Sequence, residues 1–262
     1  MNIDDPAMPG GAAAKTHTGA EYFNHITLSE SDRLARAAFQ HLVLELVPPG
    51  GALFDFGAGA GIDAKFFAER GYSIDAYDVD PKMCEFFAEY CREFIDSGRI
   101  TLTGGGYREF LAREPHGAGR LADLVISNFA PLNLVDDLPP LFAKFHALTA
   151  PGGQVLASVL SPYFIGDMKN RWWWRNTPRL WWHGHYFMPG PQAPHLRRSV
   201  GDFNRLSLPH FSLVRVFRGL PYRRQGPLQG VDMRRGGRRA WLHVAGSRFM
   251  FLLFEKCAPP KR

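Results

Sequence analysis

Short apolar runs alternate with helical segments over residues 52–160, and this alternation constrains the fold more than any other feature of the chain. The apolar runs ALFDF, YSIDAYD, ITLT, LADLVIS and GQVLASVL have the length of buried strands. Between them lie segments such as DAKFFAER and PKMCEFFAEYCREFID, whose apolar residues recur at helical spacing. Because strands that alternate with helices through short connections run parallel, the pattern predicts an α/β fold with a doubly wound, mostly parallel sheet.

Composition divides the chain into five regions. Residues 1–20 are small and rich in Pro and Gly, so we expect a disordered leader and no signal peptide. An N-terminal helical cap is expected over 21–49 and the strand–helix core over 50–160. Residues 161–198 interrupt the core with five prolines and five of the six tryptophans, which is typical of an insertion that forms a lid over a substrate. Residues 199–262 add two further strands and a basic loop to the core.

Neither a membrane span nor a metal site is predicted. No apolar run approaches the roughly 18 residues that a spanning helix needs, so we expect a cytoplasmic protein. The three cysteines, Cys84, Cys91 and Cys257, lack the spacing of zinc ligands and are expected to be small, buried side chains.

Charge is distributed unevenly along the chain. Residues 1–150 carry 12 Lys and Arg against 21 Asp and Glu, a net charge of −9, whereas residues 151–262 carry 19 against 4, a net charge of +15. All six tryptophans follow residue 170. A composition bias spread over a solvated surface accounts for part of the arginine excess. The remainder indicates an acidic, regular part and a basic, aromatic part with different tasks.

The stretch FDFGAGAG, residues 54–61, places three glycines two apart directly after an apolar run. A strand that enters a glycine loop and then a helix exposes backbone N–H groups to a ligand, and dinucleotides, nucleoside triphosphates and S-adenosylmethionine are the candidates. A P-loop is excluded because no Gly-Lys-Ser/Thr follows. A dinucleotide site fits poorly, since the third glycine comes one residue early and Ile62 stands where a small residue is needed.

An acidic residue, Asp55, stands two positions ahead of Gly57. The run from Asp55 to Gly61 resembles motif I of the class I S-adenosylmethionine-dependent methyltransferases, which carries an Asp or Glu at that place. A carboxylate there suits a ligand with an ammonium and a sulfonium, and it repels a pyrophosphate. Asp78 follows Gly57 at the spacing where a carboxylate meets a ribose diol in Rossmann-like folds. Asp80, directly before a proline, is expected to cap the next helix.

Two further features are similar to that family. APGGQ, residues 150–154, looks like the Pro-Gly-Gly turn before its fifth strand, and the runs FSLVRVF and RFMFLLFEK resemble its sixth and seventh strands. The likeness covers residues 52–160 and 199–256. It implies a seven-stranded sheet with an antiparallel last strand, an N-terminal helical cap and an insertion between strand 5 and the following helix. It also implies S-adenosylmethionine as the cofactor.

The resemblance implies a cofactor site at the carboxyl edge of the sheet. There Val79 packs on the adenine, while Asn128 and Phe129 lie beside the methionine part and the substrate. The acid that many relatives have after the third strand is missing from TGGGYREF, so backbone groups or Tyr107 are expected to serve the adenine edge. The candidate cofactor-binding residues are Asp55, Gly57, Ala58, Gly59, Gly61, Asp78, Val79, Gly106, Tyr107, Asn128 and Phe129.

Methyl transfer from a sulfonium depends on aligning nucleophile, methyl group and sulfur, and it needs a base only where the nucleophile arrives protonated. Base candidates in the insertion are Tyr163, His183, His185, Tyr186 and His195. We single out Tyr163 and the pair His183 and His185, which stands beside tryptophans in the expected lid. Tyr22 and His25, ahead of the first helix, are candidates to close over the cofactor from the other side.

The stretch NRWWWRNTPRLWWHGHYFMPG, residues 170–190, leaves the substrate open. Thr177 and Pro178 predict the start of a short helix there. The mixture of Trp and Arg fits an aromatic lid over an apolar or flat substrate, which we favour. It also fits a membrane surface, packing at the sheet edge, or a platform for RNA.

We therefore expect methyl transfer to an oxygen or nitrogen, or a carbon, nucleophile of a small aromatic or apolar metabolite. The Asn/Asp-Pro-Pro-Tyr/Phe motif of enzymes that methylate nucleobase and glutamine nitrogens is absent after the fourth strand. The alternative is a methyltransferase that acts on RNA or on a membrane lipid or quinone through its basic, Trp- and Arg-rich part. A third reading is a protein that keeps the fold without activity. The sequence indicates no oligomeric state.

Overall fold

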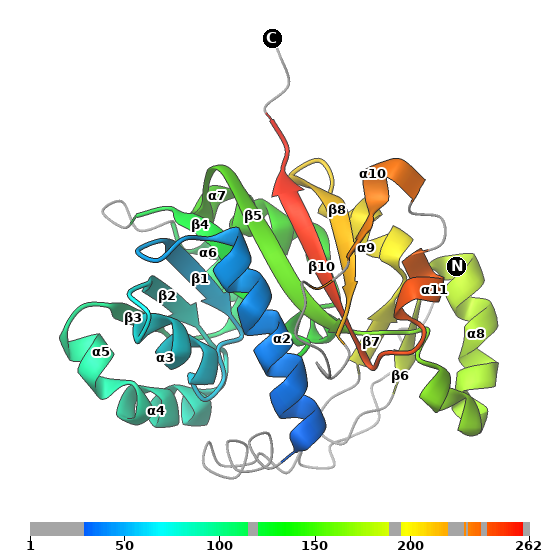
Figure 1. Ribbon diagram of the computed structural model, residues 1–262, viewed down its shortest axis with the longest axis horizontal. Helices are drawn as coiled ribbons and strands as arrows, with labels where there is room; N and C mark the ends of the chain where they lie inside the picture. The colour runs from blue at the N-terminus through cyan, green and yellow to red at the C-terminus, as the bar shows by residue number, and fades with distance from the viewer. Residues whose placement is uncertain are drawn as a thin grey trace, which may run out of the picture.

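A single eight-stranded sheet forms the centre of the molecule (Figure 1), and its strands follow the order β3-β2-β1-β4-β5-β10-β8-β9. This computed structural model describes residues 29–114, 120–188, 195–219, 228, 230–236 and 240–258. The strands are β1 (Ala52–Phe56), β2 (Ser73–Tyr77), β3 (Ile100–Thr103), β4 (Ala122–Ser127), β5 (Thr149–Leu160), β8 (Phe211–Arg218), β9 (Gly230–Asp232) and β10 (Phe249–Lys256).

The first five strands run parallel, and β10 lies antiparallel between β5 and β8. The predicted doubly wound sheet with an antiparallel last strand is therefore confirmed. The structure adds one strand to the seven expected, because the short β9 pairs antiparallel with the outer edge of β8. Three residues flanked by Arg- and Gly-rich sequence carry too little periodic signal to be predicted as a strand.

Helices cover both faces of the sheet, and alternate strand residues pack on each layer. Leu53 belongs to one apolar cluster and Phe54 to the other, since neighbouring strand residues point to opposite faces. One layer comprises α2 (Glu30–Leu46), α3 (Ile62–Ala68), α4 (Pro81–Tyr90) and α5 (Arg92–Asp96), and the other comprises α6 (Tyr107–Ala112), α7 (Leu138–Leu148), α9 (Val200–Ser207) and α11 (Ala240–Val244). Two short elements, η1 (Pro131–Leu134) and α10 (Met233–Gly236), complete the core part of the chain.

The insertion after β5 contains η2 (Ile165–Lys169), α8 (Arg171–His183) and a hairpin of β6 (His185–Met188) with β7 (His195–Arg198). In Figure 1, α8 stands at the outer edge of the molecule, far from the end of the sheet formed by β1, β2 and β3.

The expected helix start at Thr177 and Pro178 was wrong, because α8 begins at Arg171 and contains Pro178 in its interior. Side chains reinforce the turn ahead of the proline. Thr177 Oγ1 donates to the Trp173 carbonyl at 2.8 Å, and Asn176 donates to the Trp172 carbonyl at 3.0 Å. A Thr-Pro pair signals a helix start only where nothing upstream holds the chain in a helix.

The helix start predicted from the capping residue Asp80 is confirmed. Asp80 accepts a hydrogen bond from the Lys82 amide at 2.9 Å, with a proline at the first helical position of α4. Ser199 caps α9 by accepting from the Asp202 amide at 3.0 Å. Such caps fix where the helices begin, and through them the loops that carry the site.

Some sequence predictions concern residues that lie outside the described part of the chain. These are the leader 1–20, Tyr22, His25 and most of the basic loop, residues 220–227. Among the described helices, none combines the length and the hydrophobicity that crossing a bilayer demands.

Candidate active site

The loop that follows β1 needs its glycines for steric reasons. Gly57 has φ +74°, and a Cβ atom on it would lie 2.5 Å from the Pro131 side chain. Gly61 has φ +79°, and a Cβ atom on it would lie 2.7 Å from the Phe87 ring. A larger residue at either place meets both a backbone penalty and a clash. The loop is therefore packed tightly against its own protein.

Most of the loop amides are already bonded within the protein. Gly57 and Ala58 donate to the Tyr77 carbonyl at 2.9 and 3.0 Å, and Gly59 donates to Asp78 Oδ2 at 2.7 Å. The sequence-based expectation of a nest of free N–H groups, suited to an anion, is thus corrected. With these donors occupied and carboxylates nearby, the loop favours a cationic ligand over a phosphate.

A small hollow opens beside the loop, and Asp55 is one of the two buried acids that line it. The hollow is lined by Arg36, Asp55, Gly57, Ala58, Gly59, Ala60, Ile62, Asp63, Asn128 and Phe129. Asp55 Oδ2 is buried and has no hydrogen-bond partner in the described structure. Burial raises the pKa of Asp55 well above its usual range, with a further rise from Asp63 and an opposing effect of Arg36. A buried carboxylate oxygen without a donor is the feature that a bound cation would complete.

Asp63, at the start of α3, is held by three donors, of which sequence reasoning missed Arg36 and Gln40. It pairs with Arg36, and it accepts from Gln40 at 2.8 Å and from Asn128 at 3.0 Å. Arg36 and Gln40 stand four apart on α2 and so share one helix face. Two polar residues on one face of an amphipathic helix were the sequence signal that could have predicted this contact. The network compensates Asp63 and leaves Asp55 as the uncompensated acid of the hollow.

Asp78 lies at the end of β2 and bonds to backbone donors. It accepts from the Gly59 amide at 2.7 Å and from the Asp80 amide at 2.9 Å. Burial raises the pKa of Asp78, while these amide hydrogen bonds act in the opposite direction. The next residue, Val79, is 56% exposed. An acid anchored beside an exposed apolar side chain matches what a ribose and a flat base require.

The first turn of α6 brings to the loop after β3 an acid that the sequence pattern did not reveal. Glu109 accepts from the Gly106 amide at 3.3 Å, so a carboxylate does lie where three glycines stand in the sequence. The Tyr107 hydroxyl is buried without a partner in the described structure, and burial raises the pKa of Tyr107 to about 12. Tyr107 therefore stays protonated at neutral pH and is available only as a hydroxyl donor or acceptor.

Phe129 and Ala130, after β4, adopt left-handed backbone conformations with φ +60° and +71°. Two hydrogen bonds hold them: the Phe129 amide donates to Asn128 Oδ1, and the Ala130 amide donates to the Ser158 carbonyl, both at 2.9 Å. The Arg36 guanidinium lies 4.4 Å from the centroid of the Phe129 ring. Non-glycine residues in this region are uncommon and cluster at functional sites.

None of the three proposed bases lines this hollow. His183 is exposed at the end of α8, and His185 Nδ1 lies 3.5 Å from Asp202 Oδ2. The Tyr163 hydroxyl accepts from the Val200 amide at 3.3 Å. The structure therefore does not bring these side chains together with the glycine loop, and their catalytic role stays a prediction.

The two further base candidates lie on the β6–β7 hairpin. The Tyr186 hydroxyl is buried without a partner in the described structure, and burial raises the pKa of Tyr186 to about 12. Burial lowers the pKa of His195, and the charges of Arg197 and Arg248 lower it further. His195 is therefore neutral near pH 7.

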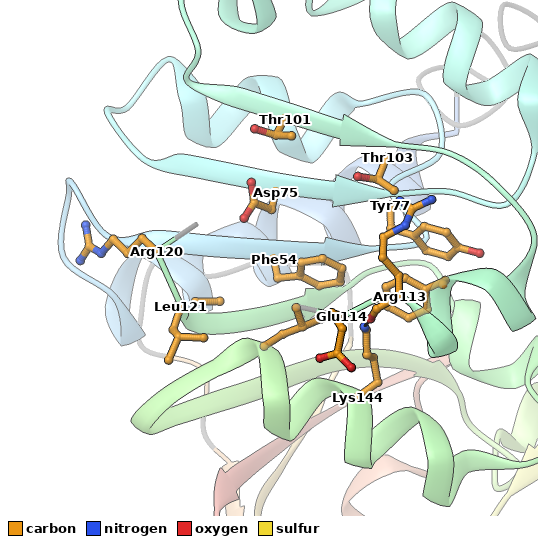
Figure 2. Close-up of a pocket in the computed structure, with 13 residues that line it drawn as sticks. Phe54, Asp75, Tyr77, Thr101, Thr103, Arg113, Glu114, Arg120, Leu121 and Lys144 are labelled. Carbon is orange, nitrogen blue, oxygen red and sulfur yellow. Dashed lines mark hydrogen bonds between the residues drawn. The ribbon is translucent and has the colours of Figure 1, made fainter. Parts of the chain in front are cut away.

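A separate hollow lies on the sheet face that α6 and α7 cover (Figure 2). Figure 2 shows Phe54 between Asp75 of β2 and the side chains of Glu114 and Lys144. The Lys144 ammonium donates to the Arg113 carbonyl, and burial lowers the pKa of Lys144. This hollow shares no lining residue with the one beside the glycine loop. It is thus not part of the candidate active site.

Free cysteines and metal ligands contribute nothing further to the site. Cys91 is buried, Cys84 and Cys257 are half-buried, and none forms a disulfide. Within the described ranges, no group of three His, Cys, Asp or Glu side chains is arranged to hold a metal ion.

Comparison with known proteins places the chain in a family. The family model for a methyltransferase domain matches residues 30–196, more than half of the chain. The chain is 25% identical over 205 residues to malonyl-[acyl-carrier protein] O-methyltransferase of Serratia marcescens, covering 75% of this chain and 74% of that protein. It is 32% identical over 119 residues to ribosomal protein L11 methyltransferase of Pelotomaculum thermopropionicum, covering 45% and 35%.

Solved structures share the fold. A Burkholderia thailandensis 1,6-didemethyltoxoflavin-N1-methyltransferase, with its substrate and S-adenosylhomocysteine bound, gives a TM-score of 0.57 at 17% identity and covers 92% of this chain and 83% of that one. A TehB-like S-adenosylmethionine-dependent methyltransferase of Corynebacterium glutamicum gives 0.54 at 14% identity, covering 91% and 97%. The chain thus belongs to the methyltransferase-domain family and is an S-adenosylmethionine-dependent methyltransferase of the class I fold.

Proposed function

We propose that the enzyme methylates an oxygen or nitrogen, or a carbon, nucleophile of a small aromatic or apolar metabolite, using the hollow beside the glycine loop. One observation carries the placement of the reaction: Asp55 Oδ2 is buried there without a donor. An ammonium group on the cofactor's methionine part supplies the missing partner. Burial and neighbouring acids raise the pKa of Asp55, because they disfavour its charged form. A bound cation would stabilise that charged form by a charge-assisted hydrogen bond that the free protein does not supply.

The proposed contacts divide by the parts of the cofactor. Asp55 would hold the ammonium, Asp78 the ribose hydroxyls, and the exposed Val79 the adenine face. The full proposed set is Asp55, Gly57, Ala58, Gly59, Gly61, Asp78, Val79, Gly106, Tyr107, Asn128 and Phe129. Bound there, S-adenosylmethionine supplies an electrophilic methyl group on a sulfonium. The protein's own part is to align the acceptor with that methyl group and to exclude water.

Phe129 is the proposed acceptor contact. Its ring lines the hollow, and its left-handed backbone is fixed by Asn128, which Asp63 in turn anchors. A rigid aromatic side chain over a small hollow suits a flat or apolar acceptor. His183, His185 and Tyr163 remain proposed bases for an acceptor that arrives protonated. For that role, His185→Gln should lower kcat at neutral pH and spare KM.

One structural neighbour, which carries the small molecule 1,6-didemethyltoxoflavin, supports a small acceptor without identifying it. The name of one relative instead specifies an acyl group carried on a protein, malonyl-[acyl-carrier protein]. An acceptor that is RNA or a membrane lipid or quinone stays the alternative, with the basic part of the chain as the contact for an anionic partner. The cytoplasmic location expected from the sequence remains a prediction.

Release of S-adenosylhomocysteine, measured over cell extracts fractionated into small metabolites, lipids and RNA, tests the proposal. We expect turnover with the small-metabolite fraction, and its loss in Asp55→Asn together with weaker S-adenosylhomocysteine binding by calorimetry. Asp96→Asn, an exposed carboxylate on α5, is the matched control and should behave as wild type. Turnover with the RNA fraction alone would show that the acceptor is RNA and that the proposed small metabolite is wrong. Full binding and activity of Asp55→Asn would overturn the proposed cofactor site.

A further inference from the structure

Helix α8 turns an unusual surface to solvent, which we call the α8 face: Arg171, Trp174, Arg175, Arg179, Trp181 and Trp182. The side chains of Trp174, Trp181 and Trp182 are 57%, 71% and 83% exposed. Trp174 and Trp181 stand seven residues apart, two helical turns, and so fall on one stripe of the helix. Large exposed aromatic side chains that gather on one helix mark an interaction surface.

The inward face of α8 already supplies the packing that holds the helix on the protein. Leu180 is buried, and the Trp172 ring lies 6.4 Å from the ring of Tyr186 on β6. Trp174 Nε1 donates to the Met168 carbonyl of η2 at 2.8 Å, which fixes one side of an exposed ring. Trp174 is therefore held in place while 57% of its side-chain surface stays exposed.

The charged side chains of residues 168–201 are all basic. Residues 168–201 contain no Asp or Glu, and the three arginines of the α8 face are all exposed. Arg171 and Arg175, and likewise Arg175 and Arg179, stand four apart and line up along the helix. A row of guanidinium groups beside a stripe of indoles complements a surface that is anionic and has an apolar layer directly beneath.

A lipid surface fits these side chains better than RNA does. Tryptophan concentrates at the boundary between water and lipid, and arginine extends along apolar surface to reach phosphates. The neighbouring elements add Ile165 on η2, 56% exposed, and Phe187 on β6, 55% exposed. Ile165, the aliphatic one of the two, gains from acyl chains and offers no ring on which a base can stack. With 13 residues, α8 is about 20 Å long, so it would lie along the surface.

We propose that the α8 face docks this enzyme on anionic lipid bilayers, with Trp174, Trp181 and Trp182 in the headgroup layer and the three arginines on lipid phosphates. Docking is peripheral and reversible. Because α8 stands at the edge of the molecule, away from the glycine loop, this contact leaves the cofactor site open (Figure 1). The proposal does not depend on which acceptor the enzyme methylates.

Flotation of the full chain with vesicles tests the proposal. We expect binding to phosphatidylethanolamine and phosphatidylglycerol at 3:1 and little binding to pure phosphatidylcholine. Replacing Arg171, Arg175 and Arg179 by Gln should weaken binding by about 100-fold. The matched control replaces Arg92, Arg108 and Arg215, three exposed arginines on other elements, by Gln and should leave binding unchanged.

Tryptophan fluorescence adds a measurement that needs no variant. Lipids brominated near the headgroup should quench the emission of the wild-type chain, and Trp181→Ser with Trp182→Ser should remove most of that quenching. Leu134→Ser with Leu208→Ser removes two exposed apolar side chains outside α8 and should not change the quenching. Calorimetry with S-adenosylhomocysteine checks that every variant is folded. Equal binding to neutral vesicles, absence of quenching, or binding to tRNA without binding to vesicles would each overturn the proposal.

Discussion

Three carboxylates crowd the glycine loop, and their partners differ. Asp63 has an ion pair and two amide donors, Asp78 has two backbone amides, and Asp55 Oδ2 has no donor in the described structure. Desolvation of an unpartnered carboxylate costs free energy in the free protein. The same carboxylate binds a cation strongly once the cation is present. Asp55 therefore lowers the stability of the free enzyme while it raises the affinity for the cofactor.

We expect Asp55→Asn to stabilise the free protein by about 1 kcal/mol at pH 7, because an uncharged amide loses less on burial than a carboxylate. The folded state raises the pKa of Asp55, so the wild type loses stability relative to the variant as the pH rises above the unfolded value of about 4. Below that value the carboxyl is protonated in both states, and the gap closes. Urea unfolding at pH 4 and at pH 7 measures the difference.

The same variant should bind S-adenosylmethionine about 10- to 100-fold more weakly, the usual value of one charge-assisted hydrogen bond. Asp96→Asn, on the exposed side of α5, should change neither stability nor affinity. If Asp55→Asn were more stable but bound S-adenosylmethionine with unchanged affinity, Asp55 would not contact the cofactor.

Gly57 and Gly98 form a matched pair of glycines that separates backbone strain from steric clash. Both have positive φ, +74° and +72°, yet a Cβ on Gly57 would lie 2.5 Å from Pro131, and a Cβ on Gly98 meets nothing within 4 Å. Gly98→Ala should cost about 1 kcal/mol of unfolding free energy from the backbone alone. Gly57→Ala should cost about 1–3 kcal/mol more and also weaken S-adenosylhomocysteine binding. Equal losses of unfolding free energy in the two variants would mean that the loop shifts enough to relieve the clash.

At the scale of elements, the sequence predicts what depends on neighbours along the chain. The cap at Asp80 and the alternation of strands and helices are local signals, and both predictions hold. The start of α8 was misplaced because a Thr-Pro signal says nothing of the side-chain bonds that support the preceding turn. Strand β9 exists only because β8 offers an unpaired edge, which no local pattern encodes.

Two helices, α2 and α3, meet at the site through an ion pair between the half-buried Arg36 and the buried Asp63. Removing the arginine leaves the Asp63 carboxylate without its cationic partner, so Arg36→Met should lower the free energy of unfolding by about 3 kcal/mol. Asp63→Asn in the same chain should recover much of that loss, because the double variant leaves no unpaired charge there. Urea unfolding of the wild type, both single variants and the double variant measures the coupling. Additive losses would show that the pair does not join the two helices.

At the scale of the whole molecule, the two halves of the charge distribution occupy different places. The acidic part, residues 1–150, supplies the glycine loop and all the lining of the hollow. The basic part supplies α8 at the far edge. Sequence patterns could place Asp55, Asp78 and Phe129 because strand ends converge at one edge of a parallel sheet. They could not place Arg36, whose partner lies 27 residues away and depends on how α2 crosses the sheet.

Hydrogen exchange distinguishes a lid from a separate surface in the insertion. Residues 57–60, 128 and 129 line the hollow, so S-adenosylhomocysteine should slow the exchange of their amides by linkage to binding. Among the described residues of α8, β6 and β7, none lines that hollow, and we expect the exchange rates of their amides to stay unchanged. A lid over the substrate would instead become protected when acceptor and S-adenosylhomocysteine bind together. Protection of residues 171–183 when acceptor and S-adenosylhomocysteine are bound would show that α8 is a lid over the substrate. Protection by anionic vesicles alone is the result that a docking surface requires.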